Sequence, residues 1–295
     1  LWSPWYVGNS MTDLDKKFGI ERVIDTPVSE SACTGAAVGA SLAGMRPIVV
    51  HPRMDFMLYA MDAIVNQAAK WSHMLGGQAH PSLTIRGIIN RGGEQGAQHS
   101  QALHAWFAHV PGLRVVMPST VKDARDLLVA SVLSPDPVLY IDDRWLYEQE
   151  DELGPVRELD LSKLGPEIRM LGDDITIVSS GHSALLAKQA AVLLLNEGIK
   201  AEVIDVRVLN PFDSSIIVDS VKKTGRLLVV DSGWESAGFS AEIMASVVEK
   251  LPVNALKNSP VRVALPNAPA PTSRMLEKEY YFTAETVVNA AKKII

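Results

Sequence analysis

Cysteine is nearly absent from this sequence: Cys33 is the only one among 295 residues. A lone thiol cannot form an internal disulfide, and a single cysteine outside any cluster of cysteines and histidines argues against structural zinc. Cys33 stands among small residues, which are typical of a buried segment. These features favour a reducing compartment.

Long apolar runs and an excess of positive charge are also missing. No apolar run reaches the roughly 18 residues of a membrane span, and residues 1–6 lack the basic and apolar regions of a signal peptide. Acidic side chains outnumber basic ones, 34 to 28, whereas nucleic-acid-binding proteins concentrate Lys and Arg on one face. We therefore expect a cytoplasmic protein that binds neither membranes nor nucleic acid.

The composition that is present, with 47% hydrophobic and 21% charged residues, is that of an ordinary globular protein. The length is about twice that of a typical domain, which favours two domains over one. Short Val- and Ile-rich runs alternate with segments whose apolar residues recur at helical spacing, the pattern of parallel sheets with crossover helices. We therefore predict an α/β fold. The expected strands are 47–50, 83–86, 113–117, 138–141, 175–179, 201–205 and 227–231, and the expected helices are 31–43, 58–74, 121–133, 183–197 and 240–250.

An acidic stretch separates two groups of these elements. Residues 147–167 contain a glycine followed by a proline and show no sustained periodicity, which is typical of a linker between two α/β units. We therefore expect a first domain at residues 1–150, a linker at 151–168 and a second domain at 169–295.

Glu30 stands at the start of a predicted helix of small residues and has two interpretations. An acidic residue at a helix start commonly caps the first turn or interacts with the helix dipole, and the local pattern alone favours this role. The alternative is a carboxyl group in an apolar pocket, where desolvation lets it share a proton with a nitrogen atom of a ligand.

His99 lies in a polar, glycine-rich loop, residues 92–101, that follows the expected strand at 83–86. Such a loop contributes little to a core, and ligands of α/β proteins bind at the carboxyl ends of the strands. His99 is therefore a candidate catalytic residue. His104 and His109 follow on a segment expected to be helical, where packing or surface roles are more common.

Five stretches, in their order along the chain, carry a resemblance that covers nearly its whole length. They are residues 22–30 (RVIDTPVSE), 63–70 (AIVNQAAK), 98–101 (QHSQ), 108–113 (AHVPGL) and 231–234 (DSGW). With them the chain resembles the beta subunit of the decarboxylating component of pyruvate and branched-chain 2-oxoacid dehydrogenases. The resemblance implies a pyrimidine-binding α/β domain, a transketolase C-terminal-type domain and thiamine diphosphate as cofactor.

The resemblance also implies partner chains. The family's beta subunit pairs with an alpha subunit in an alpha2-beta2 heterotetramer, with each active site between an alpha and a beta chain. The alpha subunit supplies a Gly-Asp-Gly motif, magnesium and the contacts to the diphosphate. Here the sequence Gly172-Asp173-Asp174 departs from that motif and is typical of a turn. A lipoyl acyltransferase is a further expected partner.

Four residues match positions at which the family contacts cofactor or substrate. Glu30 matches the glutamate that hydrogen-bonds the 1′ nitrogen of the aminopyrimidine ring and so activates the cofactor. Phe56 matches the aromatic residue that packs on this ring, and Val28 matches a neighbouring apolar contact. His99 matches the histidine that faces the thiazolium and the substrate. The resemblance thus implies Glu30 and His99 as catalytic residues.

A structural potassium ion, held mostly by main-chain oxygens, is a further feature of the family's beta subunit. The corresponding positions are Leu83, Ser131, Val132, Ser134 and Asp136. Ser134 and Asp136 replace the usual Asp and Asn side chains, and Asp136 keeps an oxygen ligand. The resemblance therefore implies thiamine diphosphate and magnesium as cofactors and leaves potassium as an additional candidate.

Departures from the family concentrate just before Phe56, at residues 51–55. In one interpretation His51 or Arg53 recognises an anionic or sugar-phosphate substrate; in the other, Arg53 and Asp55 form a solvated pair at a subunit contact. The substrate is therefore left open.

Two catalytic functions follow from the resemblance and its departures. The favoured one is oxidative decarboxylation of a 2-oxoacid, with the acyl group passed to a lipoyl acyltransferase. The alternative is transketolase-like or acyloin-forming transfer of a two-carbon or acyl unit to an aldehyde or sugar acceptor. A nonenzymatic assembly subunit is disfavoured because both Glu30 and His99 are present.

Overall fold

The first of two β-sheets is built mainly from the first half of the chain. The computed structural model describes residues 10–295. In order across this sheet lie β1 (Ile48–His51), β2 (Thr84–Ile89), β4 (Val138–Asp143), β3 (Arg114–Val116) and β8 (Val208–Asn210). The first four of these strands are parallel, and β8 pairs antiparallel with β3.

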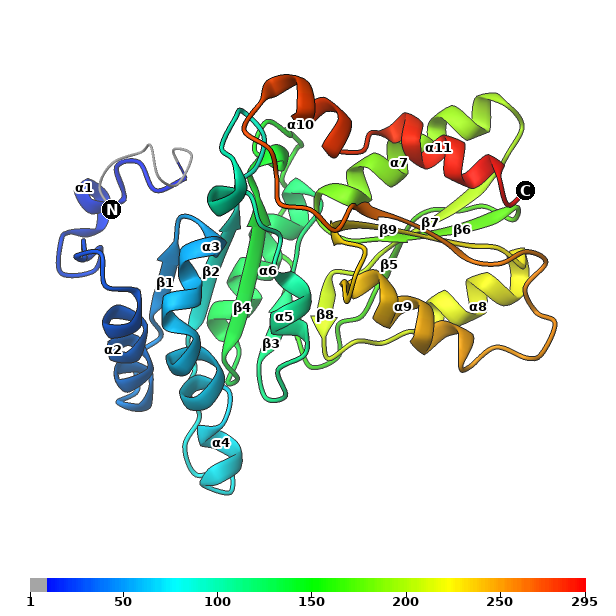
Figure 1. The fold of residues 1–295 in the computed structure, drawn as a ribbon. Coiled ribbons are helices and arrows are strands. Elements are labelled where there is room, and N and C mark those ends of the chain that lie inside the picture. The colour runs from blue at the N-terminus through cyan, green and yellow to red at the C-terminus, as the bar shows by residue number, and fades with distance from the viewer. Residues whose placement is uncertain (1–9) are drawn as a thin grey trace.

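The second sheet lies beside the first (Figure 1). Its strands, in order, are β10 (Val261–Leu265), β9 (Leu227–Trp234), β6 (Ile175–Ser179), β7 (Ala201–Asp205) and β5 (Glu167–Met170). All its pairs are parallel except that of β5 with β7. Each sheet is thus parallel apart from one antiparallel edge strand, a common arrangement in α/β proteins. The predicted α/β class with two sheets is confirmed.

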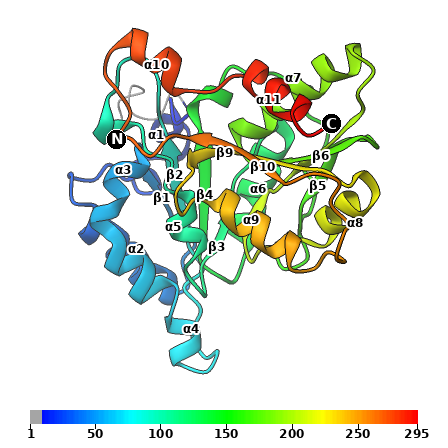
Figure 2. The ribbon, with the colours of Figure 1, turned by 45° about the vertical axis from the view of Figure 1, so that its right-hand side comes forward.

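Helices cover both sheets. In the first half of the chain they are α1 (Leu14–Phe18), α2 (Glu30–Leu42), α3 (Met54–Met57), α4 (Trp71–Met74), α5 (His104–Ala108) and α6 (Val121–Leu133). The short helical elements there are η1 (Leu58–Ala60), η2 (Asp62–Ala68), η3 (Ala97–His99) and η4 (Arg144–Leu146). The later helices are α7 (His182–Asn196), α8 (Ser215–Thr224), α9 (Phe239–Val248), α10 (Arg274–Tyr280) and α11 (Ala284–Lys292). Helices α7 and α11 cover one face of the second sheet and α8 and α9 the other, while α2 lies on the outer side of the first sheet (Figures 1 and 2).

Helix α7 shows how the sequence pattern produces this packing. Ala187, Ala190, Ala191 and Leu194 are all fully buried and recur at the spacing of one helical face. They pack on the second sheet, whose strand β6 is buried at every position because helices lie on both of its faces. Such a strand needs an unbroken apolar run rather than alternation.

The helix expected over residues 58–74 is not one regular helix. It is divided into a 3-10 turn, the π-helical η2 and α4. The backbone N–H of Ala69 donates to the carbonyl of Ile64, five residues back, at 3.1 Å. Apolar spacing does not distinguish this bonding from the usual four-residue step, so the sequence predicts the segment as helical but not its type.

One apolar core cluster includes residues of both sheets. Strand β8 follows the expected linker in the chain but pairs with β3 of the first sheet. Strand β5 begins at Glu167, inside the stretch expected to be a linker, and pairs with β7. Buried residues of both sheets, among them Val115 and Ile204, belong to the same cluster. No described helix combines the length and the apolar character needed to cross a membrane.

Candidate active site

The carboxyl ends of three neighbouring strands carry most of the predicted site residues. His51 ends β1, Asn90 follows β2 directly, and Asp143 ends β4. Because these strands are parallel and adjacent, their ends meet at one edge of the first sheet, where ligands of α/β proteins bind. We call this region, together with the loop 90–103, the carboxyl edge.

Phe56 and His99 come together at the carboxyl edge. Their ring centroids are 5.4 Å apart, with the planes at 78°, an edge-to-face contact of the kind that aromatic rings prefer. Both side chains are partly buried. Asp55 accepts a hydrogen bond from the backbone N–H of Gln101 at 3.0 Å and thereby fixes α3 to the loop that carries His99. Burial raises the pKa of the Asp55 carboxyl.

Glu30 is the first residue of α2 and is partly buried. Its carboxylate forms no hydrogen bond or ion pair with any residue from 10 to 295, and the preceding Ser29 makes no side-chain cap. Val28 is 95% exposed. One turn beyond Glu30, the Thr34 hydroxyl lies 3.2 Å from His51 Nε2 and links α2 to the end of β1. The carboxylate is thus held near the carboxyl edge and left free for a further partner.

His51 and Arg53, the two residues expected to read an anionic substrate, differ in their surroundings. His51 is 4% exposed, and burial lowers its pKa to about 4, so the ring is neutral at neutral pH. A neutral, buried ring does not attract an anion, and His51 instead contacts the Thr34 hydroxyl. Arg53 is partly buried and keeps its charge, and its guanidinium contacts the amide of Asn90.

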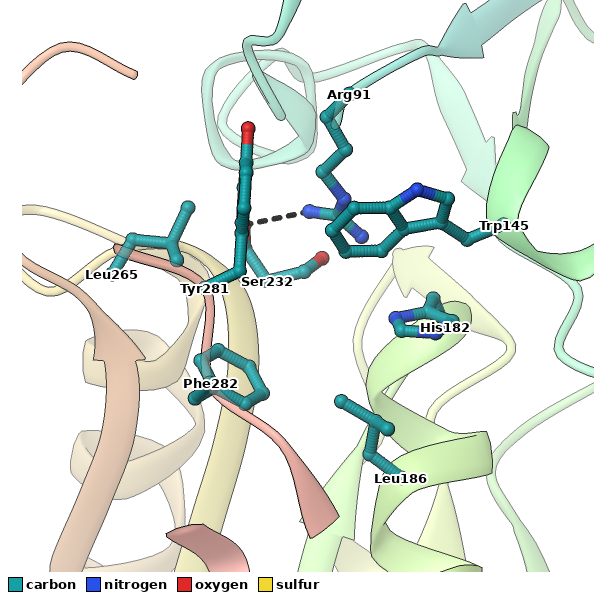
Figure 3. A pocket seen from close by; sticks show the side chains of 8 residues that line it. All are labelled: Arg91, Trp145, His182, Leu186, Ser232, Leu265, Tyr281 and Phe282. Carbon is teal, nitrogen blue, oxygen red and sulfur yellow. Dashed lines mark hydrogen bonds between the residues drawn. The ribbon is translucent and has the colours of Figure 1, made fainter. Parts of the chain in front are cut away.

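A cavity of about 10 Å³, room for roughly one water molecule, lies where the two sheets meet. It is lined by Arg91, Trp145, His182, Leu186, Ser232, Leu265, Tyr281 and Phe282 (Figure 3). The Arg91 guanidinium lies 4.7 Å from the Trp145 ring centroid, forms an ion pair with Asp143 and donates to the Ser232 carbonyl at 3.0 Å. Burial lowers the pKa of His182, across the cavity, to about 4.

These cavity residues were not among the predicted site residues. Arg91 directly precedes the polar loop that carries His99, but Trp145 and His182 lie on separate elements that only the fold brings together. Their tight packing and the buried Arg91 pair indicate that they hold the two sheets in place.

The five residues matched to a potassium site lie around the end of α6 and the start of β2, at the opposite edge of the first sheet. They are Leu83, Ser131, Val132, Ser134 and Asp136. The Leu83 carbonyl accepts from the Val138 N–H at 3.0 Å, and the Ser131 carbonyl accepts from the Ser134 N–H at 3.3 Å. Two of the expected oxygen ligands thus already have backbone donors.

Arginines occupy the remaining oxygen atoms of that set. Arg46 Nη1 donates to the carbonyls of Val132 and Ser134 at 2.7 and 2.9 Å, and Arg114 Nε donates to the Asp136 carboxylate at 2.8 Å. The Arg46 guanidinium therefore occupies the carbonyls that a potassium ion would need as ligands. Its positive charge would also repel a cation bound beside it. The residues present do not fit a potassium ion.

The outer face of α2, beside Glu30, is formed by small, uncharged residues. Ala32, Gly35, Ala36 and Gly39 are exposed along it. A Cβ atom added at either glycine would meet nothing within 4 Å. Within residues 10–295 nothing covers this face, so a close approach of another surface is possible there.

Comparisons with known proteins agree with this arrangement. The model of the transketolase pyrimidine binding domain matches residues 7–149, and that of the transketolase C-terminal domain matches residues 166–287. The beta subunit of acetoin:2,6-dichlorophenolindophenol oxidoreductase from Cupriavidus necator is 40% identical over 273 residues, 92% of this chain and 80% of the relative. Pyruvate dehydrogenase E1 component subunit beta-1 from Arabidopsis thaliana is 40% identical over 285 residues, 94% of this chain and 77% of the relative. The chain belongs to this family of E1-type beta subunits.

Other members of the family and a solved structure complete the comparison. Pyruvate dehydrogenase E1 component subunit beta from Rhizobium meliloti is 37% identical over 279 residues, which are 95% of this chain but only 60% of that relative. A solved split gene transketolase, described as an inactive beta4 tetramer, has a TM-score of 0.77 at 22% identity and covers 97% of this chain and 88% of its own. It shows the same fold. The E1-type family depends on thiamine diphosphate, in keeping with the pyrimidine binding domain.

Proposed function

We propose that this chain is the beta subunit of a thiamine-diphosphate-dependent 2-oxoacid dehydrogenase, which decarboxylates a 2-oxoacid and passes the acyl group to a lipoyl acyltransferase. The observation that carries the proposal is the Glu30 carboxylate, unpaired within the described chain at the start of α2. Val28, an exposed apolar residue two positions before Glu30, and the Phe56–His99 pair all lie in the pyrimidine binding domain.

These residues fit the aminopyrimidine half of thiamine diphosphate. The bound cofactor supplies a nucleophilic carbon that attacks the carbonyl group of the substrate. The Glu30 carboxylate shares a proton with the ring nitrogen, and its freedom from internal partners is what this role requires. Phe56 and Val28 offer apolar contact to the ring. His99, held against Phe56, faces the substrate side and stabilises charge there.

An alpha subunit is part of the proposal. The chain contains no Gly-Asp-Gly sequence, so the diphosphate and its magnesium ion need another chain. The small residues on the outer face of α2 allow such a chain to approach Glu30 closely. We infer an alpha2-beta2 heterotetramer in the cytoplasm, with magnesium held mainly by alpha. Potassium is left out because Arg46 and backbone donors already occupy its expected ligands.

The test is the variant Glu30→Gln, purified in complex with its alpha subunit. Reduction of an artificial electron acceptor, dependent on a 2-oxoacid, is expected to fall by about 10²- to 10⁴-fold, the usual contribution of a general acid–base group. The matched control is Glu21→Gln, since Glu21 is exposed in the turn before α2. Cofactor binding, measured separately by fluorescence quenching, distinguishes failed activation from failed binding. Unchanged turnover in Glu30→Gln would remove Glu30 from the mechanism.

A second candidate function is transfer of the two-carbon or acyl unit to an aldehyde or sugar. The positive charge of Arg53 at the carboxyl edge favours it, because such an edge suits a phosphorylated acceptor better than a small apolar one. A product screen with sugar aldehydes and 2-oxoacids separates the two functions. A carbon–carbon coupled product formed faster than the artificial acceptor is reduced would favour this second function.

A further inference from the structure

Three neighbouring strands place Arg53, Asn90 and Arg144 together at the carboxyl edge. Arg53 lies two residues beyond β1, Asn90 directly follows β2, and Arg144 directly follows β4. Strand β2 lies between the other two, so Asn90 stands between the two guanidinium groups. With its amide oxygen turned toward them, Asn90 accepts from Arg53 Nη1 at 2.6 Å and from Arg144 Nη1 at 3.2 Å. Asn90 is itself 6% exposed.

The acidic residues nearest to this cluster along β4 are paired with other arginines. Asp142 accepts from Arg86 at 2.5 Å, and Asp143 forms a buried ion pair with Arg91. Both carboxylates belong to well-aligned, charge-assisted contacts, which are strong and hard to replace. They are not free to neutralise a second guanidinium.

Asp55, the remaining acidic residue close to Arg53, forms no ion pair with it, and its Oδ2 atom is buried without a hydrogen-bond partner among residues 10–295. The Oδ1 atom of Asp55 accepts from the Gln101 N–H at 3.0 Å. Its field raises the pKa of Arg53, while burial, the larger influence, and the charge of Arg144 lower it. Neither Arg53 nor Arg144 forms an ion pair in the described part of the chain, and residues 1–9 contain no Asp or Glu. Two cations therefore share one neutral amide.

The cluster adjoins the residues proposed to hold the cofactor. Arg53 is the residue that precedes α3, and Phe56 lies on α3 against His99. His51, on the other side, is neutral and joined to Thr34, so it does not offset or add to the charge. An anionic group in contact with both guanidiniums would thus lie beside the Phe56–His99 pair.

We propose that Arg53 and Arg144 bind an anionic group of the substrate, a carboxylate or a phosphate distant from the reacting carbonyl. Asn90 holds both guanidiniums close together, because each donates to its buried amide oxygen. Guanidinium forks match both oxyanions, because each N–H pair can meet two oxygen atoms. The inference rests on the proposed function for the reacting site, and it names the class of substrate that the site selects.

The experiment uses the complex of this chain with its alpha subunit. The kcat/KM is measured for two matched pairs: 2-oxoacids with and without a second carboxylate, and aldehyde acceptors with and without a phosphate. The selectivity ratio is the kcat/KM of the anionic member of each pair divided by the kcat/KM of the uncharged member. Arg53→Met and Arg144→Met are expected to lower this ratio about 10- to 100-fold, the value of a hydrogen bond to a charged group. The pair whose ratio falls identifies the anion as carboxylate or phosphate.

Two further variants control for folding and for general loss of charge. Asn90→Asp keeps both arginines but supplies an internal carboxylate between them, so it is expected to lower the ratio as well. Arg262→Met removes a partly buried arginine on β10, far from the edge, and is expected to keep the wild-type ratio. A wild-type ratio near one in both pairs, or a ratio unchanged in all three edge variants, overturns the anion site.

A binding measurement separates this inference from the proposed function. Malonate and inorganic phosphate serve as probes, and the melting temperature of the complex is followed as each is added. One of them is expected to stabilise the wild-type complex and to lose this effect in Arg53→Met and Asn90→Asp. If that occurs while no 2-oxoacid or aldehyde is converted, the anion site stands and the proposed function falls. If neither probe discriminates wild type from variants, the anion site falls.

Discussion

At the scale of single residues, Asp231 on β9 shows how a buried charge is held between the two sheets. It lies 2.8 Å from His104 Nε2 of α5 and accepts from the N–H groups of Gly233 and Ser240 at 2.9 and 2.8 Å. Burial alone would raise the pKa of Asp231, but the charge of His104 and these donors outweigh it and hold the value at about 2. His104, expected to be a packing or surface histidine, is fully buried in this contact.

The pH dependence of this pair has a definite sign. The folded pKa of Asp231 is lower than the usual value of 3.8 for this side chain, so its contribution to stability is present above pH 3.8 and is lost as the pH falls through 2. The shift corresponds to roughly 2 kcal/mol of unfolding free energy. Asp231→Asn is expected to lower that free energy at neutral pH by about 3 kcal/mol, because a buried partner is left unpaired. Urea unfolding of wild type and variant measures the difference.

Asp219→Asn is the control for this prediction. Asp219 is exposed and pairs with Lys222 at 3.3 Å on the surface of α8, where such pairs contribute about 1 kcal/mol or less. The gap between wild type and Asp231→Asn is expected to narrow as the pH approaches 2. Equal losses in the two variants, or a gap that does not depend on pH, would contradict the role assigned to Asp231.

At the scale of elements, Arg46 joins the end of α6 to the segment before β1. The last carbonyls of a helix lack internal partners, and Arg46 Nη1 supplies donors to Val132 and Ser134 there. Arg46→Met is expected to lower the unfolding free energy by about 1 kcal/mol, the net contribution of such a hydrogen bond, because Arg46 is exposed and water can partly replace it. Arg274→Met is the control, since the Arg274 side chain is 75% exposed.

The same contact predicts the response to salts. Because Arg46 occupies two of the expected potassium ligands, the melting temperature of the wild-type chain is expected to be equal in KCl and NaCl at the same ionic strength. Calorimetry in the two salts makes the comparison. A stabilisation specific to potassium would show that the ion binds beside Arg46 and would contradict the assignment.

Elements with strong local patterns could be predicted from the sequence. The strands at 175–179 and 201–205 and the helix at 121–133 have the expected bounds, because each is set by its own apolar run or face. Strand β8 was not predicted, since three residues carry no periodicity and their pairing with β3 comes from a distant part of the chain. The π-helical type of segment 62–68 was not predicted either, because its apolar spacing resembles that of an ordinary α-helix.

The candidate site also contains some residues that the sequence could predict and others that it could not. Glu30, Phe56 and His99 could be named from motifs, and the structure adds that Phe56 and His99 touch. The approach of Arg53 to Arg144 could not be predicted, because β4 lies next to β2 in the sheet although β3 comes between them in the chain. Residues that meet through strand order leave no spacing signal in the sequence.

At the scale of the whole molecule, the two sheets form one unit that leaves the proposed site exposed. They share a core, are joined by β8, and are held by the buried contacts of Arg91 and Asp231. Helix α2, which begins at Glu30, lies at the far side of the first sheet from that junction (Figure 1). Assembly with another chain at α2 would therefore leave the junction between the sheets unchanged.

Ala36→Arg tests whether the outer face of α2 is the surface that the alpha subunit covers. Ala36 is exposed among small residues, so a long charged side chain there is expected to block close approach without disturbing the chain's own core. Co-purification with alpha and the oxoacid-dependent activity are both expected to be lost, while the circular dichroism spectrum of the chain stays unchanged.

Ala245→Arg makes the same change at an exposed position of α9 and is expected to leave assembly intact. Because alanine and arginine have similar helix propensities, the two variants differ in the surface they alter rather than in helix stability. An Ala36→Arg chain that still assembles and turns over at the wild-type rate would place the alpha subunit elsewhere, and Glu30 would then need a different source for the rest of its site.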